Sequence, residues 1–167
     1  MEFKIKTEAI YDCSLERAFK TPMLCDLSKI HTGYMIMPKV THTTHDVNWG
    51  KPGSSKKVYV AKSLTQNGGY ASMDKIIERE ENKYWKIQVD DFQSWFLGFH
   101  KFVGEWKVSE LEKNKVLVEY TYYLHSDMPI LYLFNWMFVH FFWKSYMKRV
   151  LENIRQMVIN NEPYLYD

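Results

Sequence analysis

The sequence predicts a single α+β domain in which one antiparallel sheet is closed by a long C-terminal helix. Three observations support this fold class. An alternating apolar and polar segment opens the chain, and two short helix signals follow it directly. Six further alternating segments are joined mostly by short turns, and apolar residues then recur at helical spacing to about residue 160. Residues 1–167 have the length of one domain.

The start of the chain predicts one strand and two short helices. Residues 2–11 alternate charged and apolar side chains, as a strand requires. Ser14 is placed to cap a helix over residues 15–20. Thr21 followed by Pro22 is typical of a new helix start, so we expect a second helix that ends near Gly33.

The middle of the chain predicts six strands. They cover residues 39–47, 58–60, 70–79, 85–89, 104–111 and 116–122. The sequence Asn67-Gly68-Gly69 is the strongest hairpin signal, because asparagine and glycine tolerate the positive φ of a tight turn. Short turns join antiparallel neighbours, so we expect a meander.

The C-terminal segment predicts one long helix. Ser126 or Asp127 can cap it, Pro129 fits its first turn, and it should end near Asn160. At 1.5 Å per residue such a helix exceeds about 40 Å. Its most apolar stretch, residues 129–143, is shorter than the roughly 20 residues of a membrane span and predicts a buried helix.

Composition excludes several classes of protein. Apolar residues make up 46% and charged residues 25% of the chain, which excludes intrinsic disorder as its main state. A net charge of +2 gives no overall field for a nucleic-acid partner. Cys13 and Cys25 have no CxxC spacing, and the N-terminus has no apolar signal segment. We therefore expect a cytoplasmic protein with free thiols.

No motif predicts a metal, a cofactor or a nucleophilic catalyst. His42 and His45 are three residues apart in a predicted strand, so their side chains should lie on opposite faces. The glycine-rich segment 50–55 leads into a strand and lacks the GK[ST] ending of a phosphate loop. No G-x-S-x-G or HExxH sequence is present. Acid–base chemistry by a single buried His or Tyr stays open.

The order of these elements resembles a known superfamily. The sequence Gly50-Lys51-Pro52-Gly53-Ser54 precedes the third strand, and Gly104-x-Trp106-x-Val108 lies in the sixth. Over essentially the whole chain the pattern resembles the helix-grip fold of the START-like (SRPBCC) superfamily, and its polyketide cyclase/dehydrase and lipid-transport branch in particular. The resemblance implies a seven-stranded curved antiparallel sheet wrapped around the C-terminal helix, with an apolar cavity between them.

The resemblance implies three alternative functions. The first is intracellular binding or transport of a hydrophobic small molecule or lipid. The second is an enzyme of the cyclase/dehydratase type that uses the same cavity. The third is a chaperone-activator-like adaptor whose cavity is filled by its own side chains. The superfamily includes carriers, sensors and enzymes, so the fold alone does not decide among them.

The candidate ligand-binding residues follow from strand parity and helical phase. Met147 and Leu151 mark the helix face that is turned toward the sheet. At 100° per residue, His140 lies on the same face, between two tryptophans. His140 should then be buried and neutral, either paired with a tyrosine in the core or orienting a ligand together with Tyr122. The opposite strand face, with Tyr123 and His125, remains an alternative. The predicted site comprises Trp106, Tyr120, Tyr122, Trp136, His140 and Trp143.

Two further groups of apolar side chains are expected to be shielded from water. The same helical phase places Phe134, Phe138 and Phe141 away from the core. We expect a homodimer contact, another part of the chain or, less readily, a membrane surface to cover them. The aromatic segment 92–99 is expected either to fold over one end of the core or to form a lid at the cavity mouth.

Overall fold

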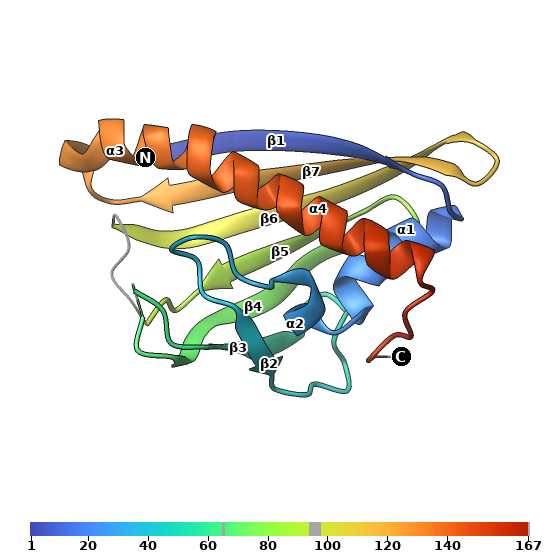
Figure 1. Ribbon diagram of the computed structural model, residues 1–167, viewed down its shortest axis with the longest axis horizontal. Coiled ribbons are helices and arrows are strands. Elements are labelled where there is room, and N and C mark those ends of the chain that lie inside the picture. Colours follow the sequence, from blue (N-terminus) through green and yellow to red (C-terminus); the bar gives the residue numbers. More distant parts are fainter. Residues whose placement is uncertain (65, 94–97, 167) are drawn as a thin grey trace.

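The computed structural model describes residues 1–64, 66–93 and 98–166. A seven-stranded antiparallel sheet with the order β1-β7-β6-β5-β4-β3-β2 lies against a long C-terminal helix (Figure 1). This is the predicted fold class. The strands are β1 (Glu2–Tyr11), β2 (Val40–Thr43), β3 (Ser55–Val60), β4 (Gly69–Glu80), β5 (Tyr84–Asp90), β6 (Phe99–Glu112) and β7 (Lys115–Ser126).

The predicted meander is confirmed from β2 to β7, and β1 joins its far edge. β1 pairs with β7 along its whole length, from Glu2 opposite His125 to Tyr11 opposite Val116. The first strand is therefore held by the last, as Figure 1 shows. β2 is shorter than the predicted run to residue 47, because the chain turns away after Thr43.

Two short helices follow β1, as predicted, but the break between them comes after Leu24 and not at Thr21, so that helix α1 covers Leu15–Leu24. Pro22 lies inside it and does not start a new helix. A proline has no N–H, so it cannot donate to the carbonyl four residues earlier, which belongs to Ala18. The indole N–H of Trp106 donates to that carbonyl at 3.1 Å. The sheet thus supplies the donor that the proline lacks, and the helix continues.

Helix α2 (Leu27–Ile30) is a single turn between α1 and β2. The Asp26 carboxylate caps it by accepting from the Ser28 N–H at 2.9 Å. Ile30 is buried, and the chain then passes His31 toward β2. This short helix therefore sets where His31 lies.

The C-terminal helix has the predicted extent but is not regular. It begins with a 3-10 turn, η1 (Pro129–Leu131), and continues through α3 (Tyr132–Met137). A π-helical segment, η2 (Phe138–Trp143), follows before α4 (Lys144–Ile159). A π-helix is wider than an α-helix, so each residue turns through a smaller angle. Within the described chain, no helix has the length and apolar character needed to cross a membrane.

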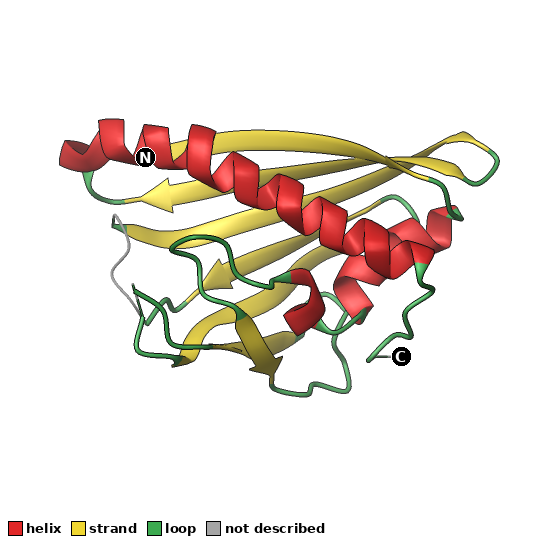
Figure 2. Cartoon of the chain, viewed as in Figure 1, coloured by secondary structure: helices red, strands yellow, loops and turns green. Residues whose placement is uncertain are grey.

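The core lies between the helix and the facing side of the sheet. Figure 2 shows the C-terminal helix lying across this face, with α1 beside its last turns. From the sheet, Trp106 and Val118 are fully buried, and from the helix Met147 and Ile154 are buried against them. Burial of this kind contributes about 25 cal/mol per Å² of apolar surface. The helix and the sheet therefore depend on each other for stability.

Candidate functional site

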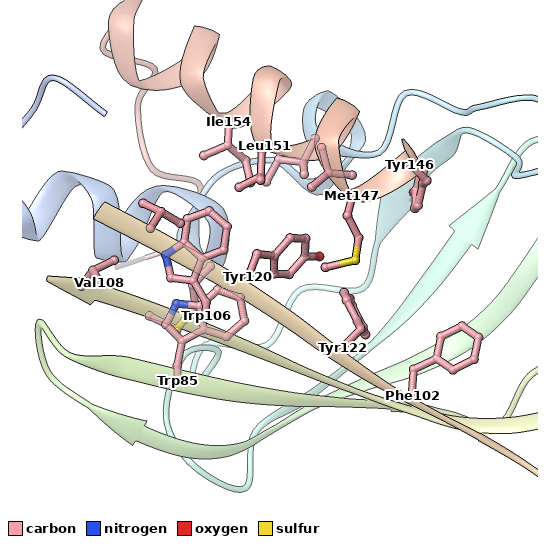
Figure 3. Close-up of a cluster of buried hydrophobic side chains, with 14 of the residues drawn as sticks. Trp85, Phe102, Trp106, Val108, Tyr120, Tyr122, Tyr146, Met147, Leu151 and Ile154 are labelled. Carbon is pink, nitrogen blue, oxygen red and sulfur yellow. The ribbon is translucent and has the colours of Figure 1, made fainter. Parts of the chain in front are cut away.

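A cavity of about 170 Å³ lies between the sheet, the C-terminal helix, α1 and the segment around α2. Four of the six predicted site residues line it: Trp106, Tyr120, Tyr122 and Trp143. Figure 3 shows Trp106, Tyr120 and Tyr122 on the sheet, facing Met147 and Leu151 of the helix. Strand parity therefore identified the inward face, and Tyr123 and His125 belong to the other face.

Trp136 and His140 were predicted wrongly to face this cavity. The Trp136 side chain is 37% exposed, and the His140 ring stacks on it with a centroid separation of 4.6 Å. His140 Nδ1 lies 2.9 Å from the Trp136 carbonyl oxygen. The prediction assumed 100° per residue throughout, whereas η2 turns more slowly, so residues before it are rotated relative to α4.

The slower turn of η2 also explains why one residue of the predicted outer face, Phe138, was placed wrongly. Phe138 is buried, at 7% exposure, and its ring lies 5.7 Å from the ring of Phe99 and 5.1 Å from that of Phe142. Phe134 and Phe141 are exposed, as expected. The exposed apolar face of the helix, here called the outer helix face, comprises Ile130, Tyr132, Leu133, Phe134, Trp136, Met137 and Phe141.

Tyrosine hydroxyls form one polar side of the cavity. Burial raises the pKa of Tyr122 to about 12, and burial likewise raises the pKa of Tyr120. Gly104 provides room for this ring, because a Cβ there would lie 3.0 Å from Tyr122 Cζ. The absence of a side chain at Gly104 therefore fixes how Tyr122 enters the cavity.

His31 and Tyr146 form a second polar pair at the cavity wall. His31 Nδ1 and the Tyr146 hydroxyl share a hydrogen bond of 2.5 Å. Burial, assisted by the nearby positive charge of Lys56, lowers the pKa of His31 to about 4. The imidazole is therefore neutral near pH 7 and can donate or accept one proton in a hydrogen bond.

Lys56 and Asp74 are the only charged side chains that line the cavity among the described residues. They lie opposite each other on β3 and β4, in the register that pairs Lys56 with Asp74. Lys56 is 2% exposed and Asp74 is 6% exposed. The Lys56 Nζ lies 3.9 Å from the ring centre of Trp49 and 5.0 Å from that of Tyr166, which gives it two cation–π contacts.

The environment moves the two pKa values toward each other. Burial lowers the pKa of Lys56 to about 8, although Asp74 opposes this shift. Burial raises the pKa of Asp74 to about 6, although Lys56 opposes that shift. The described residues offer neither the Lys56 Nζ nor the Asp74 carboxylate a hydrogen bond or an ion pair within 4.0 Å. Both groups can therefore take part in proton transfer near neutral pH.

Four residues of the cavity were not predicted from the sequence: Lys56, Asp74, His31 and Tyr146. Parity contained a signal for the first two, because Lys56 alternates with Val58 and Val60, and Asp74 with Ile76, on buried faces. Both sequence neighbours of Lys56 are polar, however, and a polar stretch of this kind is typical of a solvent-exposed segment beside a turn. His31 follows a single helical turn, and no spacing rule predicts the direction of such a residue.

The remaining predictions for this site concern the aromatic segment and metals. Phe92 and Phe99 line the cavity, whereas residues 94–97 lie outside the described part of the chain. His42 stacks on Tyr59, and His45 stacks on Tyr166. Within residues 1–64, 66–93 and 98–166, no group of three His, Cys, Asp or Glu side chains is arranged to hold a metal ion.

No protein-family model matches the chain, and no curated protein matches it in sequence. Solved structures match its fold over almost the whole length. A point mutant of norcoclaurine synthase from Thalictrum flavum, in complex with a transition-state analogue, aligns with a TM-score of 0.68, 13% identity and 98% coverage of both chains.

Two further structures give the same result. Ara h 8.0201 aligns with a TM-score of 0.65 at 13% identity, over 96% of this chain and 100% of its own. TTHA0849 from Thermus thermophilus aligns with a TM-score of 0.66 at 12% identity, over 96% of this chain and 100% of its own. The chain therefore has the same helix-grip fold as these structures.

Proposed function

We propose that this protein binds a hydrophobic small molecule or lipid in the cavity between the sheet and the C-terminal helix. The observation that carries the proposal is a cavity of about 170 Å³ whose wall is mostly aromatic and aliphatic, with a few polar groups directed into it. Binding sites for small molecules usually combine an apolar wall with few polar contacts. Lys56, Asp74, His31 and the tyrosine hydroxyls are those contacts.

The cavity also favours this function over that of an adaptor with a filled core. An adaptor of that kind needs its aromatic side chains to occupy the space between sheet and helix. Here Trp85 and Trp106 stack on each other at 6.1 Å and lie on one side of the cavity. Their indole N–H groups donate to the carbonyls of Phe19 and Ala18 in α1. The rings are thus fixed to α1 and leave the cavity open.

Titration with N-phenyl-1-naphthylamine tests this function. The probe is neutral and apolar, and energy transfer from Trp143 and Trp106 should report its binding in the cavity. Ser72 is buried and lines the cavity two residues from Asp74, so Ser72→Phe should fill the cavity and abolish binding. Phe141→Glu, on the outer helix face, should leave binding unchanged. Equal binding to wild type and Ser72→Phe would contradict the proposal.

An enzyme of the cyclase/dehydratase type is the second candidate. The favouring observation is the Lys56–Asp74 pair, whose pKa values of about 8 and about 6 suit a general acid and a general base. Norcoclaurine synthase from Thalictrum flavum, solved with dopamine and hydroxybenzaldehyde, has the same fold at 11% identity. Conversion of a cavity-bound compound by wild type, lost in Asp74→Asn with binding retained, would favour this candidate.

Two partner proposals concern the rest of the molecule. We propose a homodimer contact through the outer helix face around Phe134 and Phe141, now without Phe138, because those rings are exposed. Docking of the same face on a membrane surface is the less favoured alternative.

Cys13 and Cys25 are free thiols, which supports our proposal of a cytoplasmic location.

A further inference from the structure

The Lys56–Asp74 pair narrows the chemical class of the ligand. Each side chain is more than nine-tenths buried, each lines the cavity, and the described residues give neither polar end a hydrogen bond. Buried polar groups are almost always paired, so two unpaired ends on one cavity wall indicate a partner that enters the cavity. The partner must therefore form hydrogen bonds with both the amine of Lys56 and the carboxyl group of Asp74.

Charge excludes two kinds of partner. An organic cation in the cavity would meet the positive charge of Lys56, and an organic anion would meet the negative charge of Asp74. The pair as a whole is neutral when both groups are ionised and also when both are uncharged. A neutral ligand with one polar group therefore costs least to bring beside it, since an additional charge would need its own desolvation.

The position of Lys56 suits a nucleophilic amine. Its Nζ is held over the faces of Trp49 and Tyr166, in a wall that excludes bulk water. A desolvated lysine has a larger fraction of free amine near neutral pH than an exposed lysine, and the free amine is the form that attacks carbonyl carbons. Lys57, the next residue, also contacts an aromatic ring, that of Tyr70, but it is exposed to water and does not line the cavity.

We propose that Lys56 forms a Schiff base with a hydrophobic aldehyde or ketone bound in this cavity, and that Asp74 transfers the protons. This inference rests on the proposed binding function. The free amine of Lys56 attacks the carbonyl carbon, a C–N bond forms, and the carbonyl electron pair moves to oxygen, which takes a proton from the acid form of Asp74. Nitrogen loses a proton to Asp74.

The second half of the reaction releases water. Asp74, in its acid form, returns the proton to the hydroxyl group, and the C–O bond breaks as water leaves. The nitrogen lone pair forms the C=N bond, and the remaining N–H proton passes to the Asp74 carboxylate, which gives the neutral imine and restores the acid form of Asp74. Amine and carbonyl compound are thus converted to imine and water, with no oxidant or reductant. The pKa of Asp74, raised to about 6 by burial, keeps an acid form available for this step.

Reductive trapping tests the inference. The purified protein is incubated with octanal and sodium cyanoborohydride, which reduces an imine to a stable octyl amine, and the modified residue is located by peptide mass mapping. We expect Lys56 to be modified at least ~10-fold faster than any exposed lysine. An excess of 1-octanol, which has the same chain but no carbonyl group, should slow the reaction by competition. Lys56→Met should lose the fast modification, and Lys57→Met should keep it.

A parallel displacement of N-phenyl-1-naphthylamine by octanal separates this inference from the proposed function. If octanal displaces the naphthylamine but modifies Lys56 no faster than Lys57, the Schiff base is wrong and cavity binding stands. If neither compound binds the wild-type cavity, both proposals fail. Asp74→Asn should lower the rate of trapping at Lys56 while octanal still displaces the naphthylamine. An unchanged rate would overturn the role of Asp74.

Discussion

Lys56 and Asp74 face each other across β3 and β4 as a buried, oppositely charged pair that shares a cavity wall. A buried pair of this kind contributes little net stability, because desolvation of both charges offsets their attraction. Its retention in an otherwise apolar wall is more readily explained by binding or reaction than by folding. The opposed shifts of the two pKa values support the same interpretation.

The double variant Lys56→Met/Asp74→Leu should be at least as stable as wild type, because apolar residues of similar size need no desolvation of charge. Asp74→Leu alone should lower the free energy of unfolding by about 3 kcal/mol, since it leaves the Lys56 ammonium buried without a counter-charge. Urea denaturation of the three proteins provides the measurement. A double variant much less stable than either single variant would show that the pair holds the fold together.

Strand parity and element order predicted the fold and part of the site. They identified the meander, the closing helix and the inward direction of Trp106, Tyr120 and Tyr122. The prediction for the helix was wrong at His140, because a constant 100° per residue does not hold through the π-helical segment at residues 138–143. Lys56 was missed because its charge suggests exposure, although its alternation with Val58 and Val60 places it on the buried face of β3.

His31→Gln should change how stability depends on pH. The pKa of His31 is about 4 in the folded protein, below its ordinary value of 6.5, because burial disfavours the charged ring. Between these values the unfolded chain binds more protons, so wild type loses stability as the pH falls from 6.5 to 4.

His31→Gln lacks this proton uptake on unfolding. Its loss of stability over the same interval should be smaller by at most about 2 kcal/mol, after allowance for the partial exposure of the residue. Thermal unfolding at pH 7 and pH 4 gives the comparison. Parallel pH profiles for the two proteins would contradict burial of the imidazole.

Trp106→Phe should destabilise the protein through α1. The variant leaves the Ala18 carbonyl without its indole donor, and Pro22 cannot replace it. The lost hydrogen bond and the smaller ring should together lower the free energy of unfolding by about 3 kcal/mol. Pro22→Ala in the same background restores a backbone N–H for Ala18 and should recover part of this loss. No recovery would show that packing alone explains the effect.

Phe138 and Phe141 are a matched pair that tests the winding of η2. Phe138→Glu places a charge in the core and should cost more than about 3 kcal/mol. Phe141→Glu changes a side chain that is 63% exposed and should alter the stability of the monomer by less than about 0.5 kcal/mol. Under the homodimer proposal, Phe141→Glu should also lower the sedimentation coefficient. Similar stability losses in both variants would contradict the π-helical phase.

Tyr122→Phe and His140→Phe should differ in their effect on the affinity for a cavity ligand. Tyr122→Phe removes a hydroxyl that faces the cavity, so the affinity for a polar-headed ligand such as 1-octanol should fall. His140→Phe changes a ring that stacks on Trp136 and does not line the cavity, so the affinity should stay the same. Calorimetric titration compares the two variants with wild type. If only His140→Phe lost binding, His140 would belong to the ligand-binding site, as the sequence predicts.

Native mass spectrometry tests the central claim most directly, because it counts the small molecules that each chain carries. Freshly purified protein is incubated with a lipid extract of its expression host, desalted and measured intact, beside Ser72→Phe treated in the same way. Binding in the cavity predicts one apolar molecule per chain in wild type and none in Ser72→Phe. Wild type that carries nothing after loading, or Ser72→Phe that loads equally, would contradict it.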